Sequence, residues 1–200
     1  MRVVGPGTVT LIALVIVSIG VTVRFFTSDL RAKKALRRVA HVKIADVRDG
    51  VRVKLIGTIG RVAAPLTSPN RGEQCVYYHA WYEELQRGTK GGVGWVGVGD
   101  EQHACDFTIA DETGVAMVEG EGLDGALDPA TYVQIEAANP NERGREAVVG
   151  VGQRVAIIGR ATLEAASGTE SSLYRDGAAR VVIRVDPDIT PIVTNDPALT

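Results

Sequence analysis

The hydrophobic positions divide this chain into two parts with different patterns. Residues 3–23 contain no charged side chain, and residues 9–23 are nearly all apolar. Beyond residue 45, short apolar runs alternate with polar residues and are separated by Gly, Pro, Asn and Asp. Such runs are typical of strands joined by tight turns. The pattern therefore predicts an N-terminal apolar helix followed by an all-β domain.

The apolar run is long enough to cross a membrane. As a helix, 21 uncharged residues span a hydrocarbon layer of roughly 30 Å. The run lacks a one-sided apolar stripe, which disfavours a helix buried in a protein core. A cleaved signal peptide is the alternative, but only Arg2 precedes the run, and Arg24, Phe25 and Phe26 follow it in place of a small-residue cleavage site. We expect an uncleaved anchor over residues 1–26.

The next segment, residues 27–44, is predicted to be a juxtamembrane helix or linker and is strongly basic. Basic residues beside a membrane span favour the cytoplasmic side, and they can also contact anionic lipid headgroups. We therefore expect a single-pass protein of the cell membrane with its soluble domain on the cytoplasmic side and the lipid bilayer as a partner. The membrane-proximal basic cluster comprises Arg24, Arg31, Lys33, Lys34, Arg37 and Arg38.

Strand patterns dominate residues 45–187. A β-branched run at Gly57–Val62 leads into a turn with two prolines, and Cys75–Glu84 resumes as a strand with aromatic side chains on both faces. Asp111–Gly114 is a tight-turn sequence between two apolar runs, which predicts a hairpin. Roughly eight short strands predict an all-β barrel or small sandwich, and we prefer an OB-like, partly open barrel. Residues 188–200 are expected to form an extended tail.

Two similar octapeptides lie far apart in the sequence. Residues 50–57 read GVRVKLIG, and residues 152–159 read GQRVAIIG. They are either two related strands of one barrel or a chance match of two turn-plus-strand units. One pair is too little to define a repeat protein.

Several short motifs in this region form a recognisable set. They are Leu66–Pro69, Gly72, Cys75–Tyr78, Trp95, Phe107–Ile109, Asp111, Gly114, Val115 and Val118. Together they resemble the GIDE domain, which is found in membrane-anchored RING-type E3 ubiquitin ligases of the mitochondrial outer membrane and in bacterial relatives. The resemblance covers residues 45–161 and implies a membrane-tethered interaction domain. The family's ubiquitin transfer resides in a separate zinc-binding RING, and two cysteines are too few to build one.

Charge is distributed unevenly along the chain. Residues 39–200 carry 15 basic and 23 acidic side chains, a net charge of −8. Because phosphate contacts supply most non-specific affinity for nucleic acids, we expect no nucleic-acid partner. We therefore favour core packing over a stacking platform for single-stranded nucleic acid as the role of four aromatic residues, Tyr77, Tyr78, Trp81 and Tyr82.

Cysteines and histidines offer a candidate metal site, with Cys75, His79, His103 and Cys105 at ligand-like spacings. Residues four apart along a strand are separated by roughly 13 Å, which is too far for two ligands of one zinc ion. We therefore expect no metal and no cofactor. A disulfide between Cys75 and Cys105 requires neighbouring strands and an oxidising compartment, which the expected topology does not provide.

A nucleophilic triad of Ser68, His79 and Asp111 is also disfavoured, because no G-x-S-x-G elbow is present. We expect a binding module without catalytic residues, which captures an unknown protein or a second copy of itself beside the membrane. The alternatives are a ligase component that uses a RING supplied by another chain, an unrecognised hydrolase, or a structural envelope protein. Loops on a rigid sheet commonly carry recognition, so the candidate partner-binding residues are Leu66, Thr67, Ser68, Pro69, Asn70, Asp111, Glu112 and Gly114.

Overall fold

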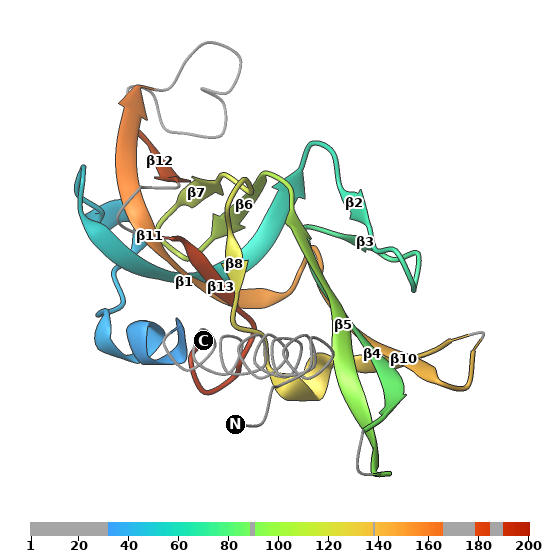
Figure 1. Ribbon diagram of the computed structural model, residues 1–200. Helices are drawn as coiled ribbons and strands as arrows, with labels where there is room; N and C mark the ends of the chain where they lie inside the picture. Colours follow the sequence, from blue (N-terminus) through green and yellow to red (C-terminus); the bar gives the residue numbers. More distant parts are fainter. Residues whose placement is uncertain (1–31, 89–90, 138, 166–178, 185–189) are drawn as a thin grey trace, which may run out of the picture.

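The computed structural model describes residues 32–88, 91–137, 139–165, 179–184 and 190–200, and these are mostly β-structure (Figure 1). This confirms the predicted all-β class. Residues 32–38 form a helix, and η1 (Ile44–Asp46) and η2 (Pro129–Thr131) are 3₁₀ helices. The strands are β1 (Arg52–Val62), β2 (Leu66–Thr67), β3 (Gln74–Cys75), β4 (Tyr77–Arg87), β5 (Val93–Ala104), β6 (Phe107–Ala110), β7 (Val115–Val118), β8 (Asp124–Gly125), β9 (Val133–Glu136), β10 (Glu142–Val149), β11 (Arg154–Ala165), β12 (Ala179–Arg184) and β13 (Ile192–Thr194).

Five strands form a barrel-like sheet in the order β1-β6-β7-β12-β11, and pairing of β1 with β11 closes it. The β7–β12 pair is parallel, whereas the other four pairs in this ring are antiparallel. Alternate side chains point inward, so Leu55, Ile157 and Ile183 are fully buried in one core. Closure leaves these strands without open edges. The arrangement is consistent with the OB-like barrel that the sequence predicts.

The two similar octapeptides are neighbours in this barrel. They form parts of β1 and β11, which pair antiparallel with Leu55 opposite Ile157. Both octapeptides end on a glycine that another strand approaches closely. A Cβ atom at Gly57 would lie 2.6 Å from the carbonyl oxygen of Ala110, and one at Gly159 would collide with the side chain of Ile183. The two octapeptides therefore occupy paired barrel strands with similar glycine contacts.

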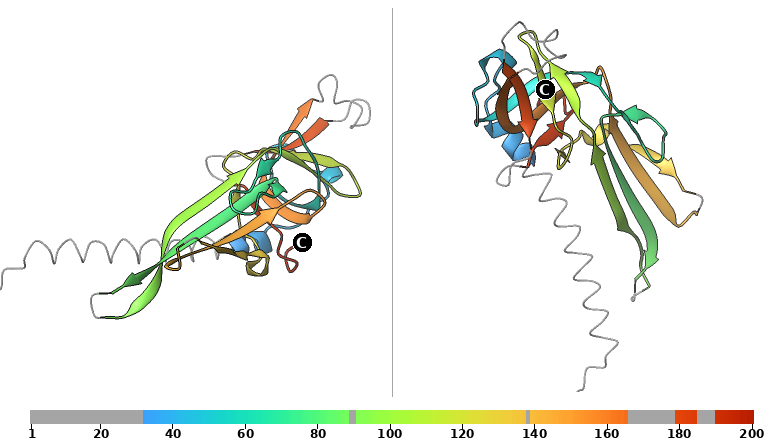
Figure 2. Two further views of the ribbon diagram at one scale, coloured as in Figure 1. Left: turned by 90° about the vertical axis from the view of Figure 1, so that its right-hand side faces the viewer. Right: turned by 90° about the horizontal axis from the view of Figure 1, so that it is seen from above.

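A second sheet projects from the barrel, with strand order β5-β4-β10-β9 (Figures 1 and 2). Its long β4–β5 hairpin is inserted between barrel strands β1 and β6, whereas β9 and β10 lie between β7 and β11. Aromatic rings cover glycines in this sheet. A Cβ atom at Gly97 would lie 2.7 Å from the ring of Trp81, and one at Gly99 would lie 3.1 Å from that of Tyr82. The sequence predicted one barrel or sandwich, and this separate sheet was missed because its β4–β10 pairing joins residues far apart in the chain.

The predicted continuous strand Cys75–Glu84 is divided at Val76 into β3 and β4. The backbone of Val76 bonds at the ends of β10 and β5, the two partners of β4, whereas β3 pairs with β2. The N–H of Val76 donates to the carbonyl oxygen of Val149 (2.8 Å), and its own carbonyl oxygen accepts from the N–H of Cys105 (2.9 Å). Val76 is fully buried where the barrel core meets the second sheet.

The two ends of the described chain pack on the outer face of the barrel. Ala32 and Leu36 of the helix form an apolar cluster with Ile158, Ile192 and Leu199. Within the region expected to be an extended tail, β13 pairs antiparallel with β11 and parallel with β8. Among the described residues, no helix has the length and apolarity needed to cross a bilayer, and the expected anchor, residues 1–26, lies outside them.

Candidate partner-binding site

The loop Leu66–Asn70 has a defined backbone conformation. β2 and β3 pair at its base, with Leu66 opposite Cys75. The buried Ser68 organises the turn, because its N–H donates to the carbonyl oxygen of Glu73 (2.9 Å) and its hydroxyl accepts from the N–H of Glu73 (3.2 Å). Gly72 closes the loop at a φ of 66°, a conformation that favours glycine.

A buried carboxylate fastens this loop to the second sheet. Glu146 of β10 is fully buried. Its Oε1 accepts from the backbone N–H and the side-chain amide of Asn70 (3.2 and 3.1 Å), and its Oε2 accepts from the N–H of Arg71 (3.1 Å). The Asn70 amide also donates to the Tyr82 hydroxyl (2.9 Å). These hydrogen bonds offset the cost of burying the charge and fix the loop on the sheet.

The side chains of the loop differ in exposure. Thr67, Pro69 and Asn70 are exposed, Leu66 is partly buried, and Ser68 is buried. The loop therefore presents three accessible side chains on a backbone that other residues hold in place. This arrangement can supply a preorganised contact surface.

The predicted hairpin turn Asp111–Gly114 is confirmed between β6 and β7. Asp111 Oδ1 accepts from the N–H and hydroxyl of Thr113 (2.7 and 2.6 Å) and from the N–H of Gly114 (3.0 Å). Burial, the largest single influence, acts to raise the pKa of Asp111. The hydrogen bonds from Thr113, Ile44 and Gly114 together outweigh burial and lower this pKa below its ordinary value.

This turn contacts the chain's own N-terminal linker. Asp111 Oδ2 accepts from the N–H of Ile44 (2.9 Å), and the Thr113 hydroxyl accepts from the N–H of Ala45 (3.1 Å). The exposed pair of Lys43 and Glu112 adds an ion pair at 3.1 Å. The predicted partner-binding residues thus lie in two places: Leu66–Asn70 against the second sheet, and Asp111–Gly114 against the linker.

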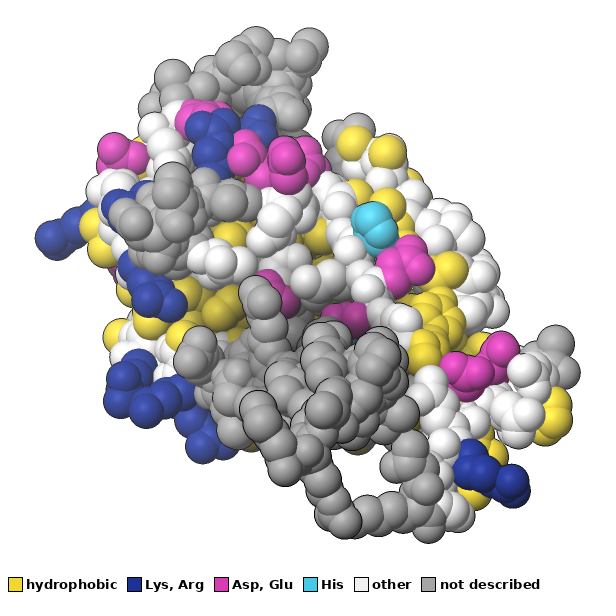
Figure 3. Space-filling view, in the orientation of Figure 1, with side chains coloured by type: hydrophobic (Ala, Val, Ile, Leu, Met, Phe, Trp, Pro, Cys, Tyr) yellow, Lys and Arg dark blue, Asp and Glu magenta, His cyan; other side chains and the backbone are white. Residues whose placement is uncertain are grey.

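The basic cluster extends beyond the described chain, because Arg24 and Arg31 fall outside it. Lys34, Arg37 and Arg38 are exposed on the helix 32–38, whereas Lys33 is partly buried. Figure 3 shows Lys and Arg side chains gathered at the lower left of the molecule, where Figure 1 places this helix.

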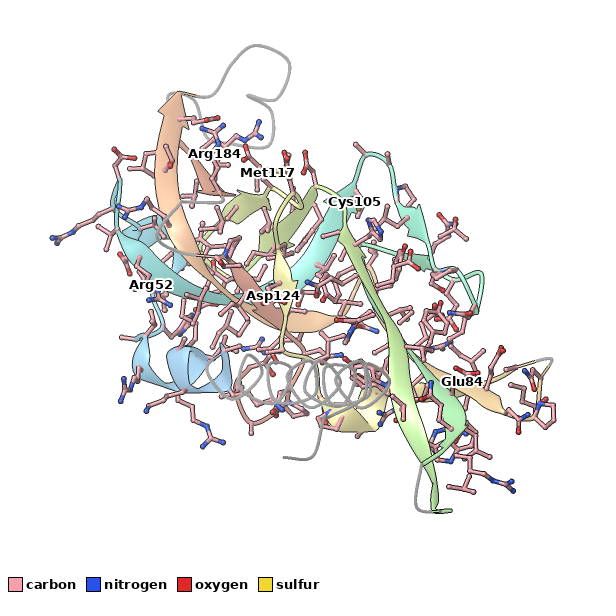
Figure 4. The ribbon with its side chains drawn as sticks, in the orientation of Figure 1. Arg52, Glu84, Cys105, Met117, Asp124 and Arg184 are labelled. Atoms are coloured by element: carbon pink, nitrogen blue, oxygen red, sulfur yellow. The ribbon has the colours of Figure 1, made fainter. Side chains whose placement is uncertain are left out.

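The two cysteines are free thiols. Burial, first, and then the proximity of Cys105 raise the pKa of Cys75 to about 11. Burial likewise raises the pKa of Cys105, which lies just beyond the end of β5 (Figure 4). Both thiols are therefore protonated at neutral pH and poorly suited to nucleophilic chemistry.

The four candidate metal ligands do not assemble. Among the described residues, no group of three or more His, Cys, Asp or Glu side chains lies close enough to hold a metal ion. His79 contacts Asp100 and Tyr132, while His103 lies 3.5 Å from Glu101 and packs against the ring of Tyr78.

The other candidate constellations are also dispersed. Ser68 contacts Glu73 and Asp111 bonds within its own turn, whereas His79 contacts Asp100 and Tyr132. The aromatic residues are used in packing and hydrogen bonds. The fully buried Tyr77 donates its hydroxyl to Gln102 (2.8 Å), and Tyr78 donates to Glu101 (2.7 Å).

Two polar features were not found from the sequence. Glu146 lies in an otherwise ordinary strand segment, and nothing local marks it as buried. His79 connects Asp100 of β5 to Tyr132, which lies 53 residues away in the sequence. Both features depend on long-range pairing, so no local pattern could have identified them.

Fold and site together define a mostly β protein with a barrel-like sheet and a projecting second sheet that carries a fixed loop. No protein-family model matches the chain. No curated protein matches it either.

Proposed function

We propose that this chain is a membrane-tethered interaction module of the GIDE type, which captures a protein partner beside the membrane through the loop Leu66–Asn70. The observation that carries this proposal is the attachment of the loop to Glu146. Because the loop is already ordered, its exposed Thr67, Pro69 and Asn70 lose little conformational freedom when a partner binds. The turn Asp111–Gly114 serves instead to position the linker.

An OB-like barrel is the proposed scaffold. The five-stranded ring, with its single parallel pair of β7 and β12, supports this assignment. OB-fold proteins are five-stranded Greek-key barrels that bind ligands through one sheet face and adjoining loops. The second sheet extends the scaffold and carries the proposed loop.

The proposed location is the cytoplasmic side of the cell membrane. The uncharged run at residues 3–23 supports an anchor, and the basic residues that follow support this orientation. Tethering raises the effective concentration of any membrane-bound partner, so that weak contacts become sufficient for capture.

Photocrosslinking in native membranes tests this function. A photoreactive amino acid placed at Thr67 or Pro69 should crosslink to one defined partner, whereas the same group at the exposed Val151, in the turn between β10 and β11, should not. The variant Thr67→Lys should remove the crosslink at Pro69 without changing the melting temperature. Equal crosslinking from Val151, or capture that survives Thr67→Lys, would contradict the proposed site. Discharge of a ubiquitin-loaded conjugating enzyme by the purified chain would contradict the non-enzymatic assignment.

A further inference from the structure

The helix 32–38 separates apolar and basic residues onto opposite sides. At about 100° per residue, Lys34, Arg37 and Arg38 fall on the side opposite Ala32 and Leu36. The structure agrees with this periodicity, because Ala32 and Leu36 are buried whereas the three basic residues are exposed.

The helix is fixed to the barrel and is therefore not a loose linker. Leu36 is fully buried and belongs to the cluster that includes Ile158 of β11 and Ile192 of β13. After the helix, the N–H of Val42 donates to the carbonyl oxygen of Lys54 (3.0 Å), and η1 is held by the turn at Asp111. The orientation of the basic side is thus set by the barrel.

Barrel strand β1 extends the positive surface beside the helix. Arg52 and Lys54 lie two residues apart on the outer face of β1, roughly 7 Å from each other. Lys54 pairs with His41, three residues beyond the helix, and Figure 4 shows Arg52 on the same side of the barrel as the helix. The ion pairs that Lys43, Arg71, Arg143 and Arg184 form with glutamates do not involve Arg52, Lys54 or the exposed basic residues of the helix.

The length of the preceding chain limits how far this surface can lie from a bilayer. Only eight residues, 24–31, separate the apolar run from the helix. Eight residues reach at most about 28 Å when fully extended and about 12 Å as a helix. A basic surface held so close to a membrane faces phospholipid headgroups at high local concentration.

We propose that Lys34, Arg37 and Arg38, together with Arg52 and Lys54, form a preorganised site for anionic phospholipid headgroups, which sets the orientation of the domain on the membrane. The inference rests on the membrane anchor of the proposed function. The site adds a second contact between protein and bilayer. The folded domain makes this contact, and the contact depends on the charge of the headgroups.

Lysine reactivity in nanodiscs tests this site. The full-length chain is inserted into discs of phosphatidylcholine alone or mixed with phosphatidylglycerol. Acylation of Lys34 and Lys54 by an uncharged reagent is measured by mass spectrometry, with Lys43 as the internal reference. One basic residue near an anionic leaflet contributes about a fivefold preference for the membrane-bound state. Phosphatidylglycerol should therefore slow acylation of Lys34 and Lys54 by about fivefold or more. Salt at about 1 M should abolish the protection, because it shortens the Debye length to about 3 Å.

Two matched variants complete the test while retaining both reporter lysines. Arg37→Gln/Arg38→Gln/Arg52→Gln should lose the protection, and Arg87→Gln/Arg145→Gln/Arg154→Gln, which changes exposed arginines elsewhere, should keep it. Equal acylation in both kinds of disc, with the chain retained in them, would overturn the inference but leave the anchor intact. Failure of the chain to enter either disc would contradict the proposed function and with it this site. Equal protection by single-stranded DNA without lipid would assign the surface to nucleic acid and overturn the proposal.

Discussion

The buried carboxylate of Glu146 offers a sharp test of how the loop Leu66–Asn70 is held. In Glu146→Gln, the amide oxygen can still accept from the two Asn70 donors, but the amide nitrogen faces the N–H of Arg71, which then has no acceptor. A buried donor left unsatisfied costs about 1–3 kcal/mol, and loss of the negative charge weakens the remaining bonds. Relief of the charge's desolvation offsets part of this cost. We expect a net destabilisation of about 2 kcal/mol.

Urea unfolding of the full-length chain in detergent, followed by tryptophan fluorescence, measures this change. Trp81 and Trp95 lie on the paired strands β4 and β5 and report on the second sheet. Amide hydrogen exchange adds a local measurement. A loss of about 2 kcal/mol corresponds to about 30-fold faster exchange at Asn70 and Arg71.

Glu142→Gln is the matched control, because Glu142 lies on the same strand but is exposed and accepts from the Asn139 side chain (3.0 Å). Its effect should stay within about 0.5 kcal/mol. If Glu146→Gln is no more destabilising than Glu142→Gln, and exchange at Asn70 and Arg71 is unchanged, the buried carboxylate does not hold the loop and the reasoning is refuted.

Three further predictions concern other parts of the molecule. Leu36→Ala should lower the free energy of unfolding by about 2–4 kcal/mol, because it leaves a cavity between helix and barrel; a change below about 1 kcal/mol in urea unfolding would contradict the packing of the helix. The pKa of Asp111 is lowered in the folded protein, so the stabilisation that its carboxylate provides is fully present above its ordinary pKa of 3.8. This stabilisation is lost as pH falls through the pKa of the folded state. Asp111→Asn should therefore lose less stability on acidification than the unchanged chain, and an equal loss would argue against this role. Cys105→Ala should cost roughly 1 kcal/mol and leave zinc content far below one ion per chain; stoichiometric zinc in the purified protein, lost in this variant, would revive the metal site.

The sequence alone determined those features that depend on neighbours along the chain. The period-two alternation of apolar and polar residues predicted the positions of most strands, since successive side chains of a strand point to opposite faces. The Asp111–Gly114 turn was predicted because Asp and Gly satisfy the backbone of a tight hairpin locally, and the Asp111 carboxylate does accept from Thr113 and Gly114. The matched octapeptides left open whether two related strands or a chance match was present, and the close approach of another strand at each final glycine emerged only in the structure.

Only the tertiary structure decided the features that join distant residues. Pairing of β4 with β10 created a second sheet and buried Glu146 beneath a loop 75 or more residues earlier in the chain. The turn at Asp111 meets Ile44 across 67 residues, and the helix 32–38 packs beside the C-terminal strand β13. A carboxylate in a strand has the same local pattern whether it faces water or a loop, so its role depends on which distant segment covers it. The fixed basic residues beside the barrel and the fixed loop Leu66–Asn70 on the sheet are both products of that long-range packing.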